Sequence, residues 1–177
     1  MNNEVKAALD SNPNITEEVK ENILELTTIF TKVFPDVNLS NFISKLKTLK
    51  IQRESMYLVK LPCQYNPFNN VISINLGRLE NSDTKHWLMH SLLGVITAKD
   101  NYYGFNNSDN TLFALNEGYT EILTNYLVGD IEDSFYIDEV IMTNLISKVI
   151  GNDILYNAYF ANDSKSVVDA MKQAEGK

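Results

Sequence analysis

The stretch from residue 86 to residue 96 constrains the fold of this chain more than any other. It is apolar on nearly every side of the expected helix, through Trp87, Leu88, Met89, Leu92, Leu93, Val95 and Ile96. A helix of this kind is stable only when neighbouring elements cover it all round. The sequence therefore predicts a central buried helix, with Ser82 or Asp83 available to cap its start.

The chain's only two histidines, His86 and His90, lie four residues apart in this helix. That spacing places both imidazoles on one helix face, as a two-histidine metal site requires. Glu117 and Glu121 are also four residues apart, in a second helix expected from about residue 116 to residue 128. Two imidazoles and one carboxylate, with a fourth position left for water, are a ligand set of catalytic zinc sites.

The rest of the chain is expected to be mostly helical, with a small sheet in its first half. The expected elements are helices over 17–33 and 40–49, strands over 56–61 and 71–76, a turn over 66–70 and a loop over 99–111. Two or three further helices follow residue 130, separated near Gly151 and Asp163. The predicted fold class is α+β.

Composition excludes several classes of partner. The formal net charge is −8 over 177 residues, so neither nucleic acid nor an anionic membrane surface is expected to bind. A lone Cys63 allows no internal disulfide, and the absence of a secretion signal or long apolar run favours a cytoplasmic protein. One domain, residues 1–177, is expected, with a helical part over 1–50 and a core over 51–177. The oligomeric state stays open.

The two ligand segments together resemble a known family. The run His86-Trp87-Leu88-Met89-His90, followed by Asn116-Glu117-Gly118-Tyr119-Thr120-Glu121, is similar to the zinc site of gluzincin metallopeptidases, in particular of small bacterial gluzincin-like proteins. The resemblance begins near residue 71. It implies a zincin-like fold for 51–177, zinc as cofactor, His86, His90 and Glu117 as its ligands, and Glu121 as a partner that orients a histidine.

Trp87 departs from the family's pattern. In His-Glu-x-x-His peptidases, the glutamate after the first histidine takes a proton from the zinc-bound water. Trp87 occupies that position here, and an indole nitrogen can donate a hydrogen bond but cannot accept a proton. The sequence therefore predicts impaired proteolysis, and no residue is assigned a catalytic role.

Three hypotheses are consistent with these residues. The first is a metallopeptidase-like protein that keeps its zinc ligands and recognises a peptide or protein, for example by strand addition beside residues 71–76. The second is an active zinc-dependent peptidase or hydrolase that uses another general base. The third is a metal-free helical interaction protein, in which the two histidines form hydrogen bonds within the core.

Overall fold

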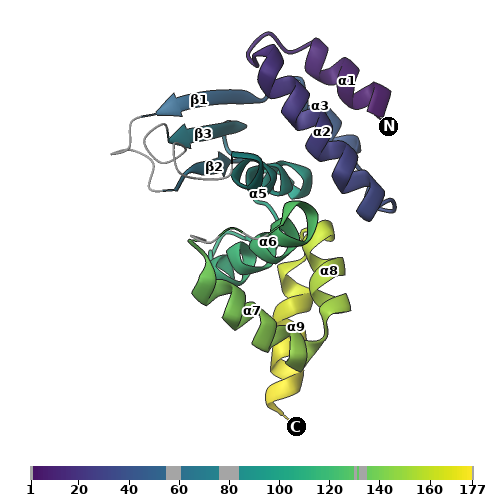
Figure 1. Ribbon diagram of the computed structural model, residues 1–177. Helices are drawn as coiled ribbons and strands as arrows, with labels where there is room; N and C mark the ends of the chain where they lie inside the picture. Colours follow the sequence, from purple (N-terminus) through teal and green to yellow (C-terminus); the bar gives the residue numbers. More distant parts are fainter. Residues whose placement is uncertain (1, 55–60, 76–83, 130, 132–134, 177) are drawn as a thin grey trace.

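The computed structural model describes residues 2–54, 61–75, 84–129, 131 and 135–176 (Figure 1). Over these residues it contains eight helices and a three-stranded sheet, which confirms the α+β class. In chain order the elements are α1 (Asn2–Asp10), α2 (Glu17–Val33), α3 (Ser40–Leu46), β1 (Lys50–Glu54), β2 (Cys63–Asn66), β3 (Val71–Asn75), α5 (Thr84–Thr97), α6 (Phe113–Val128), α7 (Ile137–Ile150), α8 (Asn152–Ala161) and α9 (Ser164–Glu175).

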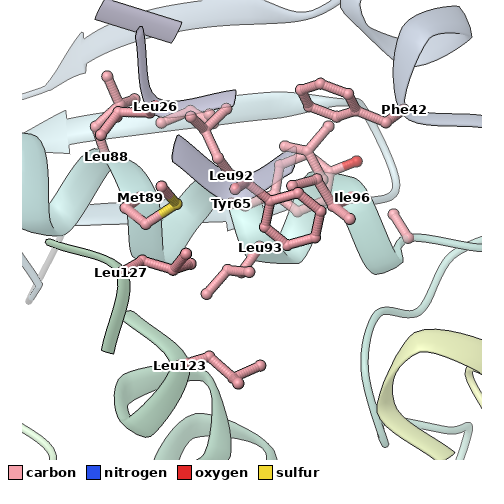
Figure 2. Close-up of a cluster of buried hydrophobic side chains, with 14 of the residues drawn as sticks. Leu26, Phe42, Tyr65, Leu88, Met89, Leu92, Leu93, Ile96, Leu123 and Leu127 are labelled. Carbon is pink, nitrogen blue, oxygen red and sulfur yellow. The ribbon is translucent and has the colours of Figure 1, made fainter. Parts of the chain in front are cut away.

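α5 is the central buried helix that its composition predicts. Every residue from His86 to Thr97 is buried. In Figure 1 the sheet and α1–α3 lie on one side of α5, and α6–α9 lie on the other. Figure 2 shows its side chains among residues of four other elements, namely Leu26 of α2, Phe42 of α3, Tyr65 of β2, and Leu123 and Leu127 of α6. The expected caps Ser82 and Asp83 lie outside the described residues.

The sheet differs from the prediction in its first two strands. Most of the expected strand over 56–61 lies outside the described residues, whereas β1 and β2 were not predicted. β1 runs parallel to β3 and pairs Ile51 with Ile72. Its sequence, Lys-Ile-Gln-Arg-Glu, has little strand preference, so pairing with β3 stabilises it. The helix expected to reach Leu49 ends at Leu46, shortly before β1 begins.

β3 is the middle strand of the sheet, in the order β1-β3-β2. It pairs in parallel with β1 and antiparallel with β2, so both of its edges are already hydrogen-bonded. Strand addition beside residues 71–76 is therefore a wrong expectation for residues 71–75, because an added strand needs an unpaired edge, and Leu76 lies outside the described residues. Val71, Ile72 and Asn75 are buried in this strand, and Ser73 and Ile74 are partly buried.

The carboxyl-terminal part contains three helices, as the upper estimate from the sequence predicts. α6 begins three residues before the expected start at Asn116 and ends at Val128. Gly129 follows as the C-cap, with a φ of 93° that favours glycine. Gly151, also at positive φ, separates α7 from α8, and Asp163 caps α9 by accepting a hydrogen bond from the Ser166 backbone. None of the described helices combines the length and the apolar content needed to cross a membrane.

Candidate functional site

Four ionisable side chains meet where α5 packs against α6. His86 and His90 project from one face of α5, and Glu117 and Glu121 project from the facing side of α6. All four are buried, with exposed fractions between 0% and 7%. Burial of charged or polar groups is unfavourable unless they find partners, so the contacts of each side chain determine what this cluster can do.

His86 faces a hydrogen-bond acceptor on each side of its ring. Nδ1 lies 3.1 Å from the carbonyl oxygen of Gly129, and Nε2 lies 3.1 Å from Oε1 of Glu121. A carbonyl oxygen only accepts, so Nδ1 carries a proton and donates it. The lone pair of Nε2 would repel an ionised Glu121 carboxylate. This contact is favourable when Nε2 also carries a proton or when a cation lies between the two groups.

His90 has a different environment. Its Nε2 is buried, lies 3.7 Å from Oε2 of Glu121, and has no hydrogen-bond partner within the described part of the chain. Its ring stacks on Tyr136, with centroids 4.9 Å apart and planes 2° from parallel. Burial lowers the pKa of His90, against the opposing effect of the charges of Glu117 and Glu121, so His90 is neutral at pH 7.

Glu117 is held by neutral donors. Its Oε1 accepts hydrogen bonds from the Tyr103 hydroxyl and from Nδ2 of Asn116, each at 3.1 Å. Tyr136 also hydrogen-bonds this carboxylate. Burial, and then the charge of Glu117, raise the pKa values of Tyr103 and Tyr136 well above that of an ordinary tyrosine, so both hydroxyls keep their protons and donate.

Sequence reasoning missed three of these contacts. Tyr103 lies in the polar loop over 99–111. Its aromatic side chain was the only indication that this position is buried. Tyr136 lies just before α7, with nothing in its local sequence to relate it to Glu117. The Gly129 contact is made by a backbone carbonyl, which leaves no side-chain signal at all.

Trp87 fills the space beside the histidines. It is fully buried, and its ring contacts those of His86 and His90 at centroid distances of 5.3 Å and 6.0 Å. Phe135 and Tyr136 pack against the same indole. Trp87 therefore acts as a packing residue at this position, in contact with both imidazole rings.

Cys63 is close to α5 but belongs to the packed interior. Its Sγ accepts a hydrogen bond from the Ser91 hydroxyl at 3.1 Å, and burial raises the pKa of the thiol to about 12. The thiolate is the nucleophilic form, so Cys63 is unreactive near neutral pH.

The donor atoms of this cluster are of the kinds that bind zinc, but their present positions are not those of a zinc site. Two carboxylates and two imidazoles, of which His90 has an Nε2 without a hydrogen-bond partner among the described residues, are suited to a divalent cation. Among the described residues, however, no group of three or more His, Cys, Asp or Glu side chains is placed to hold a metal ion. Zinc binding would require Glu117 or Glu121 to turn away from its present partners.

The chain was compared with protein-family models, with curated proteins and with solved structures. None of them matches.

We expect the stability of the metal-free protein to decrease as the pH falls below about 6.5, the ordinary pKa of histidine. The fold holds the pKa of His90 below that value, so the unfolded chain binds a proton first on acidification. One such proton changes the free energy of unfolding by up to about 1.4 kcal/mol per pH unit. Urea denaturation at several pH values measures the slope, which should be smaller in His90→Gln. Equal slopes in both proteins would contradict the role of His90.

Proposed function

We propose that this chain is a metallopeptidase-like protein that recognises peptides and in which peptide hydrolysis is impaired. The observation that carries the proposal is the position of Trp87, buried between the histidine rings and the aromatic side chains of Phe135 and Tyr136. The cluster around it contains zinc-type ligands, while the residue next to His86 cannot accept a proton.

The order of the elements supports a zincin-like arrangement for residues 51–177. A small sheet with an antiparallel outer strand, β2, precedes α5 with its histidine pair, and α6 then faces that pair with two carboxylates. β2 packs directly on α5. The sheet edge and the histidines therefore belong to one structural unit.

Zinc would be held by His86, His90 and one carboxylate of α6. The resemblance points to Glu117, whereas the structure has Glu121 nearer to both Nε2 atoms. When bound, zinc polarises a carbonyl group and lowers the pKa of a coordinated water molecule. The hydrogen bond from His86 to Gly129 orients the imidazole, and Trp87 packs against His86 without offering a base.

The outer edge of β2 is the best place for a peptide. The Asn75 backbone donates to the carbonyl of Pro62, and hydrogen-bonded pairs recur at every second residue of an antiparallel ladder. Cys63 and Tyr65 therefore direct their backbone N–H and C=O groups away from β3. An extended peptide could pair with these groups as an added strand.

A cleft of about 340 Å³ lies at the carboxyl end of β2. Residues 64–68 line one part of it, and Phe113 and residues of the loop over 101–110 line the rest. None of the lining residues is charged, and Phe68 is 70% exposed. This lining favours an uncharged peptide segment with an apolar side chain.

Metal analysis of protein purified without an affinity tag tests the zinc part of the proposal. After equilibration with zinc and dialysis, we expect about one equivalent in the natural chain and a loss of binding in His86→Ala. Thermal melting with and without zinc gives a second readout, because binding to the folded state raises its stability. Less than about a tenth of an equivalent would favour the metal-free interaction protein.

Hydrolysis of fluorogenic peptides tests the role of Trp87. We expect Trp87→Glu to gain chelator-sensitive hydrolysis about a hundredfold or more above the natural chain, because it restores a general base beside His86. Trp87→Gln is the matched control, because glutamine has nearly the same size and polarity as glutamate but cannot act as a base. Efficient, chelator-sensitive hydrolysis by the natural chain would support an active enzyme with another base.

A further inference from the structure

α7 has an apolar face that no described element covers. Ile137, Ile141, Leu145 and Val149 follow one another at intervals of four residues, and each is between 54% and 67% exposed. The opposite side of α7 packs against α6, with Thr143 fully buried. Four large aliphatic side chains in one row form a ridge about 18 Å long. Isolated exposed apolar residues are common, but a continuous row of this length is typical of an interaction surface.

A groove runs beside this ridge. It has a volume of about 370 Å³ and lies between the carboxyl-terminal halves of α7 and α9. Its walls are almost entirely apolar, formed by Leu145, Ile146, Val149, Ile150, Met171, Ala174 and Glu175. Leu145 and Val149 belong both to the ridge and to the wall of the groove. One face of the protein therefore carries a ridge and a groove side by side.

We propose that a second copy of this chain covers the α7 face and forms a two-fold symmetric dimer. In such a dimer each surface contacts the same surface of the partner. The face must therefore carry both a ridge and a groove, so that the ridge of each copy packs into the groove of the other. Rows of residues spaced by four interdigitate when two helices cross at about −50°, the commonest class of helix packing. The α7 face supplies both halves of that arrangement.

Area and charge are consistent with a dimer of moderate strength. The ridge exposes apolar surface on the order of a few hundred Å². This is less than the roughly 800 Å² per partner of a standard interface, which fits an association of only micromolar strength. Asp138, Glu175 and Lys148 give this face a net charge of −1, whereas the whole chain carries −8. Two copies therefore repel each other only weakly through this face, while an anionic membrane would repel the chain.

Sedimentation velocity over about 1 to 200 µM tests the proposal, a range suited to micromolar association. We expect the natural chain to change from a 20.1 kDa monomer to a dimer with rising concentration. Leu145→Asp should weaken the association by about 30-fold or more, because it places a charge at the centre of the interface. Ile141→Lys is a second variant of the same face. Both residues are more than half exposed, so folding should be unaffected, and circular dichroism checks this.

Phe68→Asp is the matched control, because Phe68 is an exposed large apolar residue on the turn between β2 and β3, outside the α7 face. It should dimerise like the natural chain. A natural chain that stays monomeric at 200 µM would overturn the proposal, and so would a Leu145→Asp variant that dimerises normally. Neither result depends on zinc or peptide binding, so the proposed function is tested separately.

Discussion

Replacing Glu121 with alanine is expected to reduce the free energy of unfolding by about 3 kcal/mol, from the loss of a buried hydrogen bond to a charged group and the cavity left behind. The Glu121 carboxylate is fully buried and lies 3.1 Å from Nε2 of His86 and 3.7 Å from Nε2 of His90. Without it, both nitrogens would face a cavity in the core. Urea denaturation at pH 7.5 in the presence of a chelator measures the change in the metal-free state.

Glu121→Gln is the matched control. Glutamine has nearly the same volume and keeps one oxygen that can accept from His86, so we expect a loss of about 1 kcal/mol. A loss below about 1 kcal/mol for Glu121→Ala would mean that the buried carboxylate contributes little. The contact with His86 would then be a consequence of packing.

The second large effect is expected for Gly118→Ala, which should reduce the free energy of unfolding by about 3 kcal/mol. A Cβ atom at residue 118 would overlap the backbone carbonyl of Glu139 and the hydroxyl of Thr143, both on α7. Backbone atoms cannot rotate away as a side chain can, so α7 would have to move off α6. Urea denaturation measures the loss, and an unchanged m-value would show that the same folded core is retained.

Gly94→Ala provides the comparison, because it makes the same chemical change inside α5. Its added Cβ would lie 3.1 Å from Cδ1 of the Tyr65 ring, which can shift by a few tenths of an ångström. Alanine also favours a helix over glycine by roughly 1 kcal/mol. We therefore expect a net change near zero. If both variants lost the same free energy of unfolding, the close contact between α6 and α7 would not be the cause of the loss in Gly118→Ala.

Local sequence was sufficient to predict most helices. α2, α5 and the helices after residue 130 have apolar residues at helical spacing and stop signals such as Pro35 and Gly151. The sheet was less predictable. β1 is a strand because β3 lies beside it, and β3 became the central strand only through pairing on both sides. The β1–β3 pairing joins residues 21 positions apart, which local propensity does not describe.

The candidate site shows the same division. Spacing alone placed His86 with His90 and Glu117 with Glu121 on two helix faces, and the structure brings these faces together. The partners of Glu117 could not be predicted, because Tyr103 and Tyr136 come from loop and turn positions without a helical or strand period. The assignment of these residues to zinc stays a prediction for metal analysis.

By itself the sequence determined that α5 must be buried, that its two imidazoles share a face, and that the residue next to His86 is an indole, which cannot act as a base. These properties depend on residue identity and on the 3.6-residue period of a helix. The tertiary structure decided which atoms face each other, with Glu121 against His86 and Glu117 against the two tyrosines. Hydrogen bonds depend on distances of a few tenths of an ångström, and these are set by how whole helices pack.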